Sequence, residues 1–181
     1  MVKAVPKSEI TRGDLVFCCG HGVVAWGIRT AQRLRRDWGN ATERYGDQYD
    51  HVAIVDRQLT DGDWTLVQAL THGVVEDRVG QPSRLSHYER YVVVANPADR
   101  ERTLQFARSQ IGYKYGFLTV MSFIFTLLSP RFFNIMLPRT WICSALAAES
   151  LRYGAWLHDW PDIYQVSPAQ LWCALEDVVF D

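Results

Sequence analysis

The sequence predicts an α+β protein in which helices pack around one mainly antiparallel sheet. Short apolar runs bounded by glycine or polar turn residues recur between residues 13 and 96, and turn sequences such as DG at 61–62 and THG at 71–73 separate neighbouring runs. Apolar residues with helical spacing occur at 23–38 and again in the second half of the chain. With 181 residues, 48% of them hydrophobic, the chain is expected to form one domain over 1–181 with its core at about 12–175.

The first half of the chain contains most of the predicted strands. Five are expected, at residues 13–20, 51–56, 64–70, 74–79 and 90–96. Between the first two, residues 23–38 predict a helix, and the polar stretch 41–50 predicts a loop. On that helix Val24, Ile28 and Ala31 share an apolar face. Its arginines Arg29, Arg33 and Arg36 indicate a solvated face, with an anionic partner as the alternative.

Three later segments carry helix-boundary signals. A helix is expected at about 97–110, with Asn96 as its cap and Pro97 at its first position. A second helix should begin near Cys143 and end at Gly154. The sequence SPAQ at 167–170 has the form of a capping box that opens a third. The loop IGYKYG at 111–116 precedes the most apolar window, 117–129.

Composition excludes several classes of function. The net charge of −1 gives no overall attraction to nucleic acid. No apolar leader of signal-peptide length is visible, which favours a cytoplasmic protein, with non-classical release or a phage-associated origin as alternatives. The apolar window is shorter than the roughly 20 residues needed to cross a bilayer. We therefore expect 117–137 to form a buried or cleft-covering helical hairpin, with contact to a membrane surface as the alternative.

Cysteine usage implies neither a metal centre nor a cofactor. Cys18, Cys19, Cys143 and Cys173 show no CxxC or zinc spacing and are expected to be reduced thiols. Cys143 alone stands at the start of a predicted helix, where unpaired N–H groups and the helix dipole would lower its pKa and could hold an oxyanion. Packing is the alternative reading of this cysteine.

His51 is the best candidate for a base beside such a nucleophile. It opens a predicted strand and shares a face with Ala53 and Val55. If strands 51–56 and 64–70 form a hairpin, the lone polar Gln68 comes beside it and can accept its ring N–H. The remaining histidines lie in turns or polar segments, and only His158, near Asp159 and Asp162, keeps a weak metal interpretation.

The order of these motifs resembles a known family. GDLVF, DHVAIV, LVQALTHGVV, GYKYG, WICSALAAESL and VSPAQL follow one another as in the circularly permuted NlpC-type papain-like cysteine hydrolases, over about residues 12–172. The resemblance implies Cys143 as nucleophile, His51 as base and Gln68 in the third position, where the family commonly has glutamate. It also places Tyr113 at the substrate cleft.

The expected function is therefore cleavage of amide or related acyl bonds, in a peptide or isopeptide, through a cysteine acyl-enzyme. The family's association with bacterial cell walls makes peptidoglycan peptides the first substrate to consider. Two alternatives remain. One is a lipid-directed thiol acyltransferase or phospholipase, as in relatives that resemble lecithin:retinol acyltransferase. The other is a non-catalytic binding module that keeps the fold. The sequence does not determine the oligomeric state.

Overall fold

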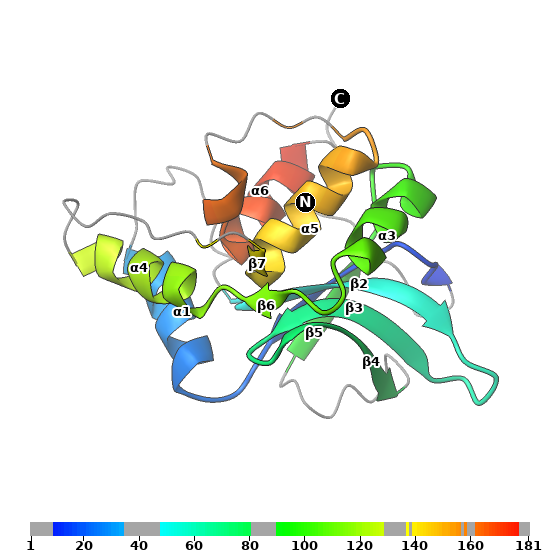
Figure 1. Ribbon diagram of the computed structural model, residues 1–181, viewed down its shortest axis with the longest axis horizontal. Helices are drawn as coiled ribbons and strands as arrows, with labels where there is room; N and C mark the ends of the chain where they lie inside the picture. The colour runs from blue at the N-terminus through cyan, green and yellow to red at the C-terminus, as the bar shows by residue number, and fades with distance from the viewer. Residues whose placement is uncertain are drawn as a thin grey trace.

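The protein combines a five-stranded antiparallel sheet with helices, which confirms the predicted α+β class (Figure 1). The computed structural model describes residues 9–34, 48–80, 90–128, 137, 139–156, 158 and 162–177. The sheet order is β4-β3-β2-β1-β5. Its strands are β1 (Leu15–Cys19), β2 (His51–Gln58), β3 (Trp64–Leu70), β4 (Gly73–Gly80) and β5 (Arg90–Val94).

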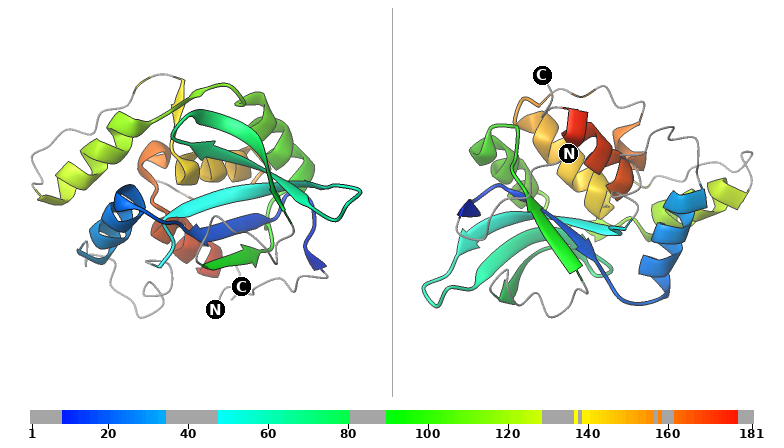
Figure 2. Two further views of the ribbon diagram at one scale, coloured as in Figure 1. Left: turned by 90° about the horizontal axis from the view of Figure 1, so that it is seen from below. Right: turned by 180° about the vertical axis from the view of Figure 1, so that it is seen from behind.

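The helices form two groups around this sheet. Those of the first group, α3 (Arg100–Ser109), α5 (Cys143–Tyr153) and α6 (Pro168–Asp177), cover one sheet face (Figures 1 and 2). Those of the second, α1 (Val23–Leu34) and α4 (Phe117–Leu128), lie side by side at one end of the molecule. A short parallel pair, β6 (Lys114–Tyr115) with β7 (Thr140–Trp141), and the 3-10 turn η3 (Ile163–Gln165) flank α5.

Strand alternation divides the buried residues between the two sheet faces. Val52 and Ile54 of β2 belong to the main core with Leu146 and Leu151 of α5, whereas Ala53 and Val55 belong to a smaller cluster with residues such as Leu66 and Cys18. Each fully buried leucine of the main core contributes roughly 1.5–3 kcal/mol of burial free energy. The α5 helix is thereby held against the beginning and middle of β2.

The predicted hairpin of β2 and β3 is confirmed, and it sets the positions of the polar side chains. The register pairs Ile54 with Val67, and β3 continues antiparallel into β4, where Leu66 pairs with Asp77. Because side chains alternate along each strand, Gln68 projects on the same face as His51.

The predicted start of the 97–110 helix is wrong. The helix begins at Arg100, and its N-cap is Asp99, whose carboxylate accepts from the N–H groups of Glu101 and Arg102. The Asn96 side chain instead donates to the Gly13 carbonyl and accepts from the Ala98 N–H. Anchoring to the turn before β1 thus removes Asn96 from the capping position, and Asp99 supplies the cap.

Two other helix boundaries are confirmed. Gly154 ends α5, and Ser167 and Gln170 exchange the two hydrogen bonds of a capping box at the start of α6. The predicted helix 23–38 is confirmed through Leu34, whereas Arg36, residues 35–47 of the expected helix end and loop, 129–136 of the expected hairpin, and Asp159 lie outside the described residues. Among the helices that the structure describes, none has both the length and the apolar character to cross a membrane.

Candidate active site

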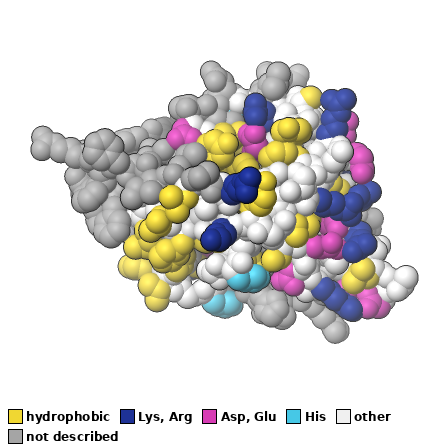
Figure 3. All heavy atoms as spheres, viewed as in Figure 1, with side chains coloured by type: hydrophobic (Ala, Val, Ile, Leu, Met, Phe, Trp, Pro, Cys, Tyr) yellow, Lys and Arg dark blue, Asp and Glu magenta, His cyan; other side chains and the backbone are white. Residues whose placement is uncertain are grey.

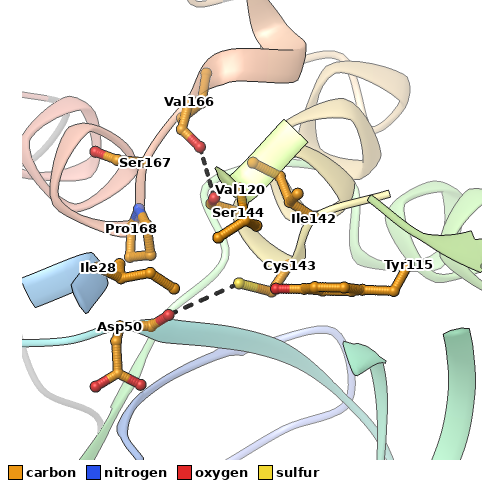
Figure 4. A pocket seen from close by; sticks show the side chains of 10 residues that line it. All are labelled: Ile28, Asp50, Tyr115, Val120, Ile142, Cys143, Ser144, Val166, Ser167 and Pro168. Atoms are coloured by element: carbon orange, nitrogen blue, oxygen red, sulfur yellow. Dashed lines mark hydrogen bonds between the residues drawn. The ribbon is translucent and has the colours of Figure 1, made fainter. Parts of the chain in front are cut away.

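Cys143 is the first residue of α5 and lines a pocket that is partly open to solvent, with a volume of about 340 Å³ when its open mouth is included (Figure 4). Ile142 precedes it as an extended N-cap residue whose side chain makes no cap hydrogen bond. The first-turn N–H groups are therefore left to other acceptors. The expectation that Cys143 opens a helix is confirmed.

The Cys143 sulfur meets the backbone on both sides of His51. Its Sγ lies 4.0 Å from the carbonyl oxygen of Asp50, and the N–H of Val52 hydrogen-bonds to it and lowers its pKa (Figure 4). The nucleophile candidate is thus seated against the first peptide groups of β2, the strand that carries the candidate base.

The expected lowering of the Cys143 pKa is not what the structure shows. The side chain is only 5% exposed, and this burial raises its pKa to about 11. The N–H groups of Val52, Ser144 and Cys143 itself act in the opposite direction, and the charge of Asp50 adds to the rise. Desolvation therefore outweighs the helix start, and the resting thiol is neutral at physiological pH.

His51 and Gln68 lie together as predicted. The His51 Nε2 atom is 2.9 Å from Oε1 of Gln68, a side chain that is 1% exposed. Burial lowers the pKa of His51, while the Gln68 hydrogen bond and the charge of Asp50 raise it, with a net decrease. A neutral imidazole, which a general base requires, is the consequence.

Asp50 and Arg29 form a buried ion pair beside the pocket, so the expectation that Arg29 lies on a solvated helix face or binds an external anion is wrong. Arg29 Nη1 donates to Oδ2 of Asp50 and, at 2.9 Å, to the Gly20 carbonyl. The N–H of Gly20 also donates to the Asp50 carboxylate, at 3.0 Å. Burial nevertheless raises the pKa of Asp50, because the Gly20 and Arg29 contacts offset desolvation only in part.

Tyr115, rather than the predicted Tyr113, is the tyrosine that lines the pocket. Its side chain extends beside Cys143 with the hydroxyl toward the sulfur (Figure 4), and burial followed by the charges of Cys143 and Asp50 raises its pKa. Tyr113 is partly buried against the core, and its carbonyl accepts from the N–H of Val74 at 2.8 Å.

The rest of the pocket wall is mainly apolar. Its other side chains come from Ile28 of α1, Val120 of α4, Ile142, Ser144, Val166, Ser167 and Pro168. Ser144 Oγ donates to the Val166 carbonyl at 2.5 Å, which ties the start of α5 to the segment before α6.

Sequence reasoning missed Asp50 and Tyr115 as neighbours of Cys143, and Arg29 as the partner of Asp50. Tyr115 lies two residues after Tyr113, so alternation along an extended segment was a usable signal for it, whereas Asp50 was indicated only by its position next to His51. The Arg29 contact had no local signal, since it joins α1 to the start of β2.

Comparison with known proteins adds no relative to this picture. No family model matches the chain, and a search of the curated proteins finds no match.

Proposed function

We propose that this protein is a cysteine hydrolase of amide or related acyl bonds, with Cys143 as nucleophile, His51 as base and Gln68 as the group that orients His51. One observation carries the proposal. The Cys143 sulfur sits against the peptide groups on both sides of His51, and His51 in turn bonds Gln68. The permuted papain-like fold, in which the histidine strand precedes the cysteine helix, is part of the same proposal.

Proton transfer would accompany the attack. Because the pKa of Cys143 is about 11 and that of His51 is lowered, the resting pair is neutral. The thiol proton passes to His51 as sulfur bonds the substrate carbonyl carbon, and the first-turn N–H of Cys143 stabilises the oxyanion. His51 then protonates the departing amine as the carbon–nitrogen bond breaks, which leaves a thioester.

Water completes the cycle. It loses a proton to His51 and attacks the thioester carbonyl, the carbon–sulfur bond breaks, and the proton returns to the sulfur as the acid is released. The apolar wall formed by Ile28, Val120 and Ile142 favours an acyl group with an apolar side chain. A peptide or isopeptide, a cell-wall peptide among them, is the first substrate class to test.

The test is covalent labelling with a peptidyl acyloxymethyl ketone that carries an apolar residue, read cysteine by cysteine by mass spectrometry. We expect Cys143 to react faster than Cys173, the most accessible of the other three thiols, and His51→Ala to slow it by roughly 10²-fold or more. His72→Ala is the matched control, because His72 lies exposed in the turn between β3 and β4. Equal labelling of Cys143 and Cys173, or no effect of His51→Ala, would overturn the proposal.

A specific surface feature favours a second candidate, a lipid-directed thiol acyltransferase or phospholipase. Hydrophobic side chains gather over α1 and α4 (Figure 3), where Val23 is 83%, Trp26 63% and Phe117 49% exposed. Neither helix contains an acidic residue, and α1 carries the exposed Arg33 in addition to Arg29, which is paired with Asp50. Both helices also contribute to the pocket wall, so a lipid surface docked on them would bring acyl chains toward Cys143.

Vesicle flotation separates the two candidates. If lipid is the substrate, the protein should float with phosphatidylcholine vesicles, more so when phosphatidylserine is added, and Trp26→Ser with Phe117→Ser should abolish flotation. Tyr153→Ser is the matched control, since Tyr153 is exposed on α5, away from these two helices. A protein that stays in the soluble fraction with both vesicle types would exclude the lipid-directed candidate.

A further inference from the structure

The hydrogen bonds of His51 continue beyond Gln68 to a carboxylate on the next strand. Gln68 Oε1 lies 2.9 Å from Nε2 of His51, and Gln68 Nε2 donates to Oδ2 of Asp77 at 3.3 Å. The three side chains come from β2, β3 and β4, which are adjacent in the sheet. The contacts therefore form one chain across three strands, His51–Gln68–Asp77.

The strand register explains why Asp77 is the carboxylate that takes part. Gln68 pairs with Val75 and Leu66 pairs with Asp77, so Asp77 projects on the same face as Gln68, one diagonal step away. Glu76, the preceding residue, projects on the other face, where it forms an ion pair with Arg57 at 2.6 Å. Two neighbouring acids of β4 thus face different partners.

The chemistry of the three groups fixes the direction of each hydrogen bond. A carboxylate can only accept, so Asp77 requires the NH₂ end of the Gln68 amide. The amide oxygen then faces His51 and requires a ring N–H at Nε2. In a neutral imidazole this places the unprotonated, proton-accepting nitrogen at Nδ1.

We propose that Asp77 is a positioning residue for His51: it holds the Gln68 amide in one orientation and thereby fixes the Nε2–H tautomer of the imidazole. Its importance for catalysis rests on the proposed function, but the tautomer itself is a property of the folded protein. Without an acceptor at position 77 the amide can turn over, present its NH₂ group to Nε2, and stabilise the Nδ1–H tautomer, which cannot accept a proton at Nδ1.

Asp50, Cys18 and Cys143, which also lie near His51, do not impose this choice. The charge of Asp50 raises the pKa of His51 and acts on the imidazolium rather than on one tautomer of the neutral ring. Cys18 on β1 pairs with His51 in the register, and burial raises the pKa of its thiol well above the usual value, so it is neutral. The sulfur of Cys143 is likewise neutral, and it lies against the Asp50 carbonyl and the Val52 N–H, the peptide groups on either side of His51.

The experiment is a long-range ¹H–¹⁵N correlation spectrum of the full chain at a pH where His51 is neutral, with His51→Ala to assign its signals. We expect the Nε2–H tautomer in the wild-type protein. Asp77→Asn, whose amide can donate to the Gln68 oxygen, should raise the ratio of Nδ1–H to Nε2–H by roughly tenfold to a hundredfold, since hydrogen bonds to charged groups are the strong ones. Glu76→Gln is the matched control and should leave the tautomer unchanged.

A double variant tests the mechanism of the effect. In Gln68→Glu with Asp77→Asn, position 68 again presents only acceptors to His51, and the Nε2–H tautomer should return. Asp77→Ala, which removes the acceptor without adding a donor, should give a mixture of tautomers and serves if Asp77→Asn does not fold.

Two results would overturn the inference: an Nδ1–H tautomer in the wild-type protein, or an unchanged tautomer in both Asp77 variants. The outcome is separable from the proposed function, because tautomer spectra need no substrate. If labelling of Cys143 proves independent of His51 while Asp77→Asn still changes the tautomer, the hydrolase proposal fails and the positioning role of Asp77 stands.

Discussion

The ion pair between Arg29 and Asp50 offers a direct test of how the pocket is held together. Arg29→Met largely keeps the packing of the aliphatic part of the Arg29 side chain, but the Asp50 carboxylate, only 4% exposed, loses its cationic partner. Removing one partner of a buried pair costs about 3–5 kcal/mol. Asp50 would still accept from the N–H of Gly20, so we expect the lower end, about 3 kcal/mol of unfolding free energy.

The measurement is urea unfolding followed by circular dichroism, with a thermal melt in parallel. A loss of this size corresponds to a decrease of about 6–12 °C in Tm for a chain of this length. Arg33→Met, an exposed arginine one turn further along α1, is the control and should change stability by less than about 0.5 kcal/mol.

The pH dependence of the loss gives a second, independent check. Burial raises the pKa of Asp50, and without Arg29 it should rise further. A carboxyl group whose pKa is higher in the folded than in the unfolded protein stabilises the fold when protonated, and this contribution is lost as the pH rises through the folded-state pKa. The deficit of Arg29→Met should therefore be full at neutral pH and shrink as the solution is acidified through that pKa. A deficit below about 1 kcal/mol at neutral pH, or one that is independent of pH, would refute this reasoning.

Three further outcomes are expected. Asp50→Asn removes a negative charge that raises the pKa of Cys143, so the pH profile of Cys143 alkylation should move to lower pH, while Asp61→Asn, in the exposed turn between β2 and β3, should leave it in place. Gly73→Ala should lower the free energy of unfolding in urea by about 2–4 kcal/mol, because its φ is +127° and the new Cβ would lie 2.7 Å from the Tyr113 carbonyl oxygen. Gly112→Ala is the comparison: its φ is +91° and the space around it is open, so only the backbone strain of about 1–2 kcal/mol should be lost. Ser144→Ala removes the donor to the buried Val166 carbonyl and should cost about 1–3 kcal/mol in the same assay, and no loss of stability would show that this hydrogen bond does not hold the pocket wall.

Much of the site follows from short-range sequence patterns. Apolar runs separated by turn residues predicted β2, β3 and β4, and alternation along paired strands put Gln68 beside His51. The position of Cys143 at the start of α5 followed from the helical pattern that begins there. These features depend on residues close together in the chain, or on a hairpin whose register a tight turn sets, so the sequence alone contains the information.

Only the tertiary structure decided the protonation state of the Cys143 thiol and the groups that surround it. The helix start predicted a lowered pKa, but packing of α5 against the sheet buries the sulfur and raises its pKa to about 11. Arg29 forms an ion pair with Asp50 instead of facing solvent, and Asp77 on β4 accepts a hydrogen bond from Gln68 on β3. In both cases, contacts between distant segments select one partner among several similar side chains. Desolvation and charge pairing depend on everything that surrounds a group in three dimensions, and no local pattern of residues records them.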